Sequence, residues 1–158
     1  MNIIEAKTII VSDKINIAII VSRFNKSINN NLLDGVVNTL IRVGNVKENN
    51  ITIIWVPGVY EIPIIANKLV HINKYKAIVT IGTVIKGETN HHYYIVNECV
   101  SRLSEISVNN IIPITFGILT TSNIEQAVKR SGIKLNNKGV EIALATLEMI
   151  NLIYNLSK

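Results

Sequence analysis

Cysteine is almost absent from this sequence, which has one such residue, Cys99, among 158. A single cysteine excludes a disulfide within the chain and is typical of a protein kept in a reducing compartment. We therefore expect a cytoplasmic protein. The sequence shows no group of Cys and His residues with the spacing of metal ligands, so we expect no metal site.

Long hydrophobic runs are also missing, although hydrophobic residues make up 48% of the chain and charged residues only 17%. No run approaches the roughly 20 apolar residues that span a bilayer. Residues 1–14 carry several charges where a signal peptide would be apolar. We therefore expect no membrane segment. The length of 158 residues predicts a single domain, residues 1–158, and the apolar surplus favours burial of surface against other subunits.

The positive charge of the chain is mild and dispersed. The formal net charge is +5, but the lysines are scattered and no basic strand is interleaved with aromatic residues. We therefore expect no nucleic-acid partner. A weak positive field of this kind favours small anionic substrates.

Four short runs rich in Ile and Val are bounded by Gly, Pro, Ser or Asn. Such runs are typical of strands covered on both faces in a parallel sheet. They are Ile15–Val21, Ile51–Val56, Ala77–Ile81 and Ile112–Phe116.

Apolar residues at helical spacing occupy the segments between and after these runs. The spacing predicts helices around residues 28–41, 64–69, 95–106, 124–128 and 140–150. The order of elements predicts an α/β fold, a three-layer α/β/α sandwich around a four-stranded parallel sheet of flavodoxin-like order. The segment Asn2–Val11 is predicted as an extra N-terminal strand, added to the sheet of a neighbouring subunit.

Polar and glycine-containing segments follow the predicted strands. In an open parallel sheet, ligands bind beyond the carboxyl ends of the strands, so these segments would meet at the ligand-binding edge. They are Ser22–Asn25, Pro57–Glu61, Gly82–His91 and Phe116–Gly117.

Two residues of this edge have alternative interpretations. Phe24 either packs as a hydrophobic staple onto the helix that begins near Ile28, or it offers a stacking surface to a flat heteroaromatic ring. Glu61 either caps a helix start or binds a hydroxyl group of a ligand. Both alternatives remain open on the sequence alone.

The segment Gly82–Thr89 is predicted as a loop that leads into a helix near Asn90. Free N–H groups there, with the Thr89 hydroxyl, would form an anion site suited to phosphate. The segment lacks the sequence of an ATP-binding or dinucleotide-binding loop. His91, in the first turn of the helix, either exchanges protons at this site or is an ordinary surface residue. His92 is expected to be structural.

Arg130 and Lys138 flank the segment Ser131–Asn137. Arg130 either compensates the negative end of a helix or clamps a phosphate, and Lys138 is either solvated or placed near a ligand ring. The functional alternative would bring both residues to the site across a subunit interface.

Five stretches, in order and at matching separations, resemble those of the lumazine synthases over nearly the full chain. They are Arg23–Asn25; Val56–Pro63; Gly82–Gly87 with Thr89 and His91; Phe116–Thr121; and Glu125–Ala127 through Arg130 to Asn137–Gly139. Each is weak alone, but together they are specific. The chain departs from the commoner pattern at Tyr60, where Phe is frequent, at His92, where an aromatic residue is usual, and at Asn136, where Gly is common.

The resemblance implies a transferase that needs no cofactor. This family condenses 5-amino-6-(D-ribitylamino)uracil with 3,4-dihydroxy-2-butanone 4-phosphate to 6,7-dimethyl-8-ribityllumazine in riboflavin biosynthesis. It also implies a homopentamer, with a shell of twelve pentamers left open and riboflavin synthase as a candidate partner. The short segment Ser131–Asn137 is compatible with shell formation.

The resemblance further implies roles for individual residues. The ribitylaminouracil would contact Phe24, Val59, Tyr60, Glu61, Thr83, Val84, Ile85, Phe116 and Lys138. The phosphate would contact Gly87, Glu88, Thr89 and Arg130. His91 would transfer protons. An adjacent subunit would supply Phe116, Arg130 and Lys138.

Three other function classes would place different requirements on the sequence. A non-catalytic flavin- or lumazine-binding module would need neither the phosphate site nor His91. A receiver-like signalling domain needs acidic residues where this chain has Ser22–Arg23 and Gly82–Thr83, so the sequence excludes it. A purely structural shell protein would not need intact site motifs.

Overall fold

Four parallel strands form the central sheet of the residues that the computed structural model describes, which are 1–6, 10–12, 14–132 and 137–157. These strands are β1 (Ile17–Ser22), β2 (Ile51–Val56), β3 (Ala77–Ile85) and β4 (Ile114–Thr121). Their order in the sheet is β2-β1-β3-β4, and all neighbouring pairs are parallel. The predicted four-stranded parallel sheet is confirmed.

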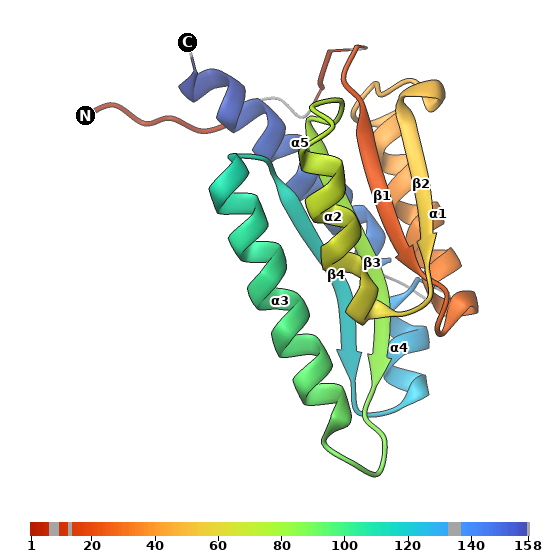
Figure 1. Ribbon diagram of the computed structural model, residues 1–158. Coiled ribbons are helices and arrows are strands. Elements are labelled where there is room, and N and C mark those ends of the chain that lie inside the picture. The colour runs from red at the N-terminus through yellow and green to blue at the C-terminus, as the bar shows by residue number, and fades with distance from the viewer. Residues whose placement is uncertain (7–9, 13, 133–136, 158) are drawn as a thin grey trace.

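Helices cover both faces of this sheet and complete three layers (Figure 1). One face carries α2 (Ile62–Val70) and α3 (His91–Asn110), and the other carries α1 (Lys26–Arg42), α4 (Ile124–Arg130) and α5 (Lys138–Leu156). Two short 3₁₀ turns, η1 (Glu48–Asn50) and η2 (Val59–Glu61), lie on either side of β2 in the sequence. Each face of the sheet therefore has its own hydrophobic core.

The central strand β1 shows why its sequence is apolar at almost every position. Ile17, Ile19 and Val21 pack into the core under α1 and α5, whereas Ala18 and Ile20 pack into the core under α2 and α3. All six residues of β1 are buried. A strand covered on both faces has no solvent-facing side that polar residues could occupy.

The edge strand β2 departs from the prediction of strands covered on both faces. Ile53 and Trp55 remain 42% and 36% exposed in the single chain. β2 lies at the edge of the sheet and pairs only with β1, so the residues of this strand are less completely covered than those of β1. An apolar edge of this kind is uncommon on the outside of a protein that stays monomeric.

Two strands continue beyond their predicted ends. β3 ends at Ile85 and β4 at Thr121, whereas the sequence predicted ends at Ile81 and Phe116. The last four residues of each strand still pair with each other, from Gly82 with Ile118 to Ile85 with Thr121. The predicted loop Gly82–Thr89 is therefore a strand in its first half, and Phe116 lies inside β4 instead of at its end.

The predicted N-terminal strand Asn2–Val11 is described only in part, because residues 7–9 lie outside the described residues. Residues 1–6 and 10–12 form no strand with their own chain. The Val11 N–H donates to the main-chain oxygen of Gly44 over 3.0 Å, which fixes the end of the segment beside α1. Pairing with a neighbouring subunit stays a prediction.

Among the described residues, α5 is long and apolar enough to cross a membrane, with a mean hydropathy of 1.2 over its most apolar window. In this fold, apolar residues of α5 contribute to the hydrophobic core. Ala143, Leu147 and Ile150 pack into the core, and the buried Thr146 hydroxyl lies 2.7 Å from that of Thr115 in β4. This packing favours a core helix over a membrane span.

Candidate active site

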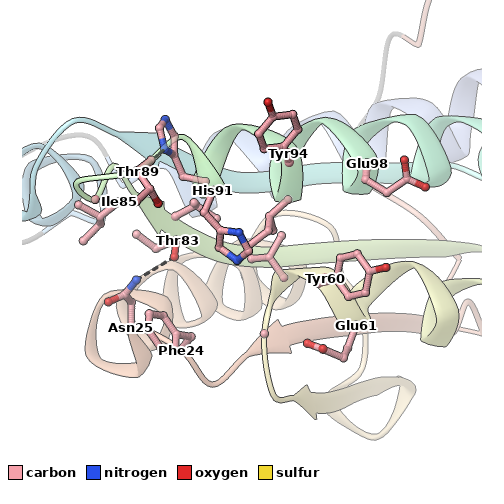
Figure 2. Close-up of a pocket in the computed structure, with 16 residues that line it drawn as sticks. Phe24, Asn25, Tyr60, Glu61, Thr83, Ile85, Thr89, His91, Tyr94 and Glu98 are labelled. Carbon is pink, nitrogen blue, oxygen red and sulfur yellow. Dashed lines mark hydrogen bonds between the residues drawn. The ribbon is translucent and has the colours of Figure 1, made fainter.

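A cavity of about 980 Å³ opens at the carboxyl ends of β1 and β3. Its wall is built by the turn after β1, the η2 turn, the end of β3 and the first two turns of α3 (Figure 2). It is lined by Phe24, Asn25, Gly58, Val59, Tyr60, Glu61, Thr83, Val84, Ile85, Gly87, Thr89, His91, His92, Tyr94, Ile95 and Glu98. The cavity lies where an open parallel sheet is expected to bind ligands.

Phe24 presents its ring to this cavity. Its side chain is 73% exposed, so it does not pack as a staple onto α1. Asn25, the N-cap of α1, adopts the left-handed conformation with φ 61° and ψ 42°. This conformation reverses the chain immediately after β1, and Phe24 occupies the tip of the turn. The ring therefore offers an open face to a flat ligand.

The turn that carries Phe24 is fastened to β3. The Asn25 side-chain amide donates to the main-chain oxygen of Thr83 over 2.8 Å (Figure 2). Thr83 is only 2% exposed, while Val84 and Ile85 become partly exposed as β3 leaves the core. The end of β3 therefore forms a rigid wall facing the turn.

The η2 turn forms another part of the cavity wall. Tyr60 is 63% exposed there. Glu61 occupies the N-cap position of α2, yet its side chain makes no capping hydrogen bond. Glu61 therefore lies at the helix start as the capping interpretation expects, but its carboxylate makes no hydrogen bond to the N–H groups of α2 and can accept hydrogen bonds from a ligand. Figure 2 shows Tyr60 and Glu61 side by side at the cavity.

The segment between β3 and α3 closes one end of the cavity. Gly87 and Thr89 line it, and α3 begins at His91 without a side-chain cap from Asn90. An uncapped helix start presents main-chain N–H groups and the positive end of the helix dipole. His92 also lines the cavity, and its Nδ1 lies 3.2 Å from the main-chain oxygen of Thr89.

The structure brings ten of the predicted site residues into one cavity and leaves four outside. Glu88 is exposed on the same loop but does not line the cavity. Phe116 lies within β4 and is 41% exposed. Arg130 ends α4, on the face of the sheet opposite α3, and the Lys138 ammonium lies 2.7 Å from Glu141. The last three are those expected from an adjacent subunit.

Several cavity residues were not assigned by sequence reasoning. Tyr94, Ile95 and Glu98 lie one and two turns beyond His91 on α3. Residues three, four and seven positions apart share one helix face, so this spacing could have identified them. Asn136 lies outside the described residues.

The Glu98 carboxylate, which lines the cavity, forms an ion pair with Arg102 of the same helix, α3. Arg102 Nε lies 2.7 Å from Glu98, and Arg102 Nη1 lies 3.0 Å from Glu105. Hydrogen bonds to Glu98 and then Glu105 raise the pKa of Arg102. Within the described parts of the chain, no group of three or more His, Cys, Asp and Glu could hold a metal ion.

Cys99 lies on the same helix but faces away from the cavity. It is 1% exposed and packs in the core under α2 and α3. Burial raises the pKa of its thiol to about 12. A thiol that stays protonated at neutral pH is a poor nucleophile, so Cys99 is a core residue.

These features define a class of protein. A parallel α/β sheet carries, at the carboxyl ends of its strands, an aromatic surface, a free carboxylate and a histidine at a helix start. This is the arrangement of an α/β enzyme that acts on a flat, hydroxyl-bearing small molecule.

Comparison with known proteins gives the family. Residues 14–154 match the family model of 6,7-dimethyl-8-ribityllumazine synthase. The chain is 58% identical to the 6,7-dimethyl-8-ribityllumazine synthase of Blochmanniella pennsylvanica (strain BPEN) over 153 residues, which cover 97% of this chain and 96% of that protein. For the synthase of Blochmanniella floridana the identity is 52% with the same coverage. For that of Yersinia pestis (strain Pestoides F) it is 48%, covering 97% of both chains. The chain therefore belongs to the 6,7-dimethyl-8-ribityllumazine synthase family, and the predicted resemblance is confirmed.

Proposed function

We propose that the cavity at the carboxyl ends of β1 and β3 is where this chain performs the reaction of its family. The chain is a transferase of riboflavin biosynthesis. It condenses 5-amino-6-(D-ribitylamino)uracil with 3,4-dihydroxy-2-butanone 4-phosphate, and the products are 6,7-dimethyl-8-ribityllumazine, phosphate and water. The observation that carries the assignment of the site is the gathering of ten predicted residues around one cavity.

The pyrimidine substrate would lie between Phe24 and the end of β3. The exposed Phe24 ring gives one flat face, and main-chain groups of Thr83–Ile85 lie at the cavity wall to read polar edges of the ring. The ribityl chain would extend along η2. Main-chain groups of Val59 and Tyr60 would donate hydrogen bonds to its hydroxyls and accept them. The Glu61 carboxylate, which makes no capping hydrogen bond, would accept hydrogen bonds from these hydroxyls.

The phosphate would lie at the start of α3. Gly87 and Thr89, which line the cavity, would supply main-chain and hydroxyl groups there, and the helix start adds a positive dipole. Glu88, on the same loop but outside the cavity lining, would contribute only if it moves toward the phosphate. Arg130 of an adjacent subunit would complete the charge balance. A guanidinium matches the geometry of two phosphate oxygens, which favours Arg for this task.

His91 would move protons between the two substrates. The amine of the pyrimidine attacks the ketone of the phosphate substrate, and the resulting imine loses phosphate before the ring closes. Each step requires that an amine or hydroxyl release or gain a proton. An imidazole can do this near neutral pH. No enzyme nucleophile is needed, because the substrate amine is itself the nucleophile.

The complete site would require an assembly of subunits. In one chain α4 and α3 lie on opposite faces of the sheet, so Arg130 and His91 of the same chain do not share a cavity. The exposed Ile53 and Trp55 on β2 give apolar area for a contact between copies. We propose a cytoplasmic homopentamer, with the twelve-pentamer shell as a further stage and riboflavin synthase as its partner.

A direct assay tests the proposed function. Both substrates are mixed with the purified protein, and lumazine fluorescence and phosphate release are followed together. The two signals should rise in step and exceed the enzyme-free background. His91→Ala should lower the rate by about 10²- to 10⁴-fold without abolishing it. The matched control is His71→Ala, because His71 ends α2 outside the cavity and should leave the rate unchanged. Binding of ribityl-pyrimidines without either signal would mean a binding module and would reject the proposal.

A further inference from the structure

We infer that Asn29, a buried residue of α1 that does not line the cavity, is the positioning residue for the Phe24 stacking surface. The inference rests on the proposed function, in which Phe24 faces the pyrimidine. It assigns a task in substrate binding to a side chain that touches no substrate.

The side chain of Asn29 joins three segments of the chain. Its Nδ2 donates to the main-chain oxygens of Ser22 and Phe24, in each case over 2.8 Å. Its Oδ1 accepts from the Thr83 hydroxyl over 2.7 Å. One buried carboxamide therefore links the last residue of β1, the residue that carries the ring, and the wall of β3.

The directions of these hydrogen bonds fix how the amide lies. A hydroxyl can donate to Oδ1, whereas the two carbonyl oxygens need the N–H groups. Rotating the carboxamide by half a turn would place an oxygen against two carbonyl oxygens. The orientation is therefore determined, and the turn at Phe24 is held at a set distance from Thr83.

Phe24 depends on this clamp because little else holds it. Phe24 is 73% exposed, so packing does not fix its side chain. Its direction follows from the main chain of the turn, which is held by Asn29, by the Asn25 amide on Thr83 and by the Arg23 N–H on the Val56 oxygen. Of these three contacts, the Asn29 amide is the one made to the main chain of Phe24 itself.

The sequence around Asn29 separates positioning from core packing. Its neighbours on the buried face of α1 include Ile28, Leu32, Leu33 and Val36, and Asn29 itself is 0% exposed. An apolar side chain of the same shape, such as Leu, would suit this surrounding. Thr39, the other polar side chain buried on the described α1, bonds back to Gly35 of the same helix, whereas the hydrogen bonds of the Asn29 amide all lead to the turn and to the cavity wall.

A double-mutant cycle tests the inference. Asn29→Leu keeps the number of side-chain heavy atoms and removes all three hydrogen bonds. We expect it to raise the KM for the ribitylaminouracil by about 2- to 10-fold, the range of one aromatic stacking contact. The KM for the phosphate substrate should stay within about twofold, because the phosphate site lies at α3. In a Phe24→Ala background, Asn29→Leu should add nothing to the pyrimidine KM.

Two further variants serve as a control and as a replacement for Asn29→Leu. Thr39→Val removes a buried side-chain hydrogen bond within the same helix, from the Thr39 hydroxyl to the Gly35 oxygen. It should leave the pyrimidine KM unchanged, which separates positioning from general loosening of α1. If Asn29→Leu fails to fold, Asn29→Asp replaces it, since Asp keeps the acceptor for Thr83 and loses both donors. The same raised KM and the same lack of additivity are expected.

The outcomes distinguish failure of the proposed Phe24 role from failure of the Asn29 inference. If Phe24→Ala leaves the pyrimidine KM unchanged, the proposed role of Phe24 is wrong, and the inference falls with it. If Phe24→Ala raises that KM while the Asn29 variant is silent, or its effect multiplies with that of Phe24→Ala, the inference is overturned and the proposed function stands.

Discussion

The Asn25 side-chain amide donates to the main-chain oxygen of Thr83 over 2.8 Å, across 58 positions of the sequence. Asn25 is at the same time the left-handed N-cap of α1, with φ 61°, three residues after β1 ends at Ser22. Asparagine tolerates this conformation better than most residues do. One residue therefore both reverses the chain and ties the reversal to the cavity wall.

Two substitutions at Asn25 should separate these tasks. Asn25→Gly loses the hydrogen bond but adopts the left-handed conformation readily, whereas Asn25→Ala loses the hydrogen bond and is strained in that conformation. Both should raise the pyrimidine KM, because the turn is released from β3. Asn25→Ala should also cost about 1 kcal/mol more in stability, from the strain of a Cβ in this conformation. Thermal midpoints at matched protein concentration check this. Equal midpoints for the two variants would contradict the strain argument.

Sequence patterns were sufficient for the element types but not for all strand ends. The apolar run of β1 predicted a strand on local grounds alone. Gly82–Ile85 contains Gly and Thr and resembles a loop when considered locally. It is a strand because β4 pairs with it, and this pairing joins residues 36 positions apart, Gly82 with Ile118. Partners at such a distance are not visible in local periodicity.

The site residues also divide into those that local sequence identifies and those whose roles depend on contacts distant in the sequence. The sequence placed Phe24 after a strand but could not choose between staple and stacking surface, and only its exposure of 73% decides. The Asn29 clamp was not recognised, because a single buried Asn in a helix carries no pattern of its own. Arg130 and Lys138 lie outside the cavity of one chain, so their predicted roles depend on an assembly.

The Cys99 thiol should react slowly with thiol reagents at neutral pH, and its raised pKa should lower the stability of the folded protein at high pH. Burial raises the pKa of its thiol from 9.0 to about 12. Below pH 9 the thiol is protonated in both folded and unfolded states, so its contribution to stability is fully present. Between pH 9 and 12 only the unfolded state loses the proton, so stability falls as pH rises, by at most about 1.4 kcal/mol per pH unit.

The Cys99 prediction is checked by labelling and by denaturation. Labelling with a thiolate-specific reagent should be slow for the folded protein and fast in denaturant. Cys99→Ala should reduce the loss of stability between pH 9 and 12 relative to the parent protein. Rapid labelling of the folded protein at pH 7 would show that the thiol is not buried as described.

Ile111 holds a conformation that a β-branched residue rarely adopts. It ends α3 in the left-handed region, with φ 50° and ψ 44°, and its side chain is 76% exposed. Glycine is the usual residue at such a helix end, and Asn is the next best. We expect Ile111→Gly and Ile111→Asn each to raise the thermal midpoint, by relieving strain of about 1–2 kcal/mol. The control is Ile124→Asn, an exposed isoleucine in α4, which should not raise it. A lower midpoint for both Ile111 variants would mean that another subunit covers this side chain.

Two defective variants should restore activity when they assemble together. Arg130→Ala should mainly raise the KM for the phosphate substrate, and His91→Ala should mainly lower kcat, so each is impaired alone. In one chain Arg130 and His91 lie on opposite sides of the sheet, so each complete site would take one residue from each of two subunits. In randomly mixed oligomers about a quarter of the sites would then combine an intact His91 with an intact Arg130.

Co-expression of the two variants with different affinity tags, followed by tandem purification, gives such mixed oligomers. Their activity at low concentrations of the phosphate substrate should clearly exceed the mean of the two variants measured separately. The control is the same mixture prepared from separately assembled oligomers without exchange, which should give only the mean. Activity equal to the mean in co-assembled oligomers would show that Arg130 does not complete the His91 site of a neighbour. A silent Arg130→Ala would remove Arg130 from the phosphate site altogether.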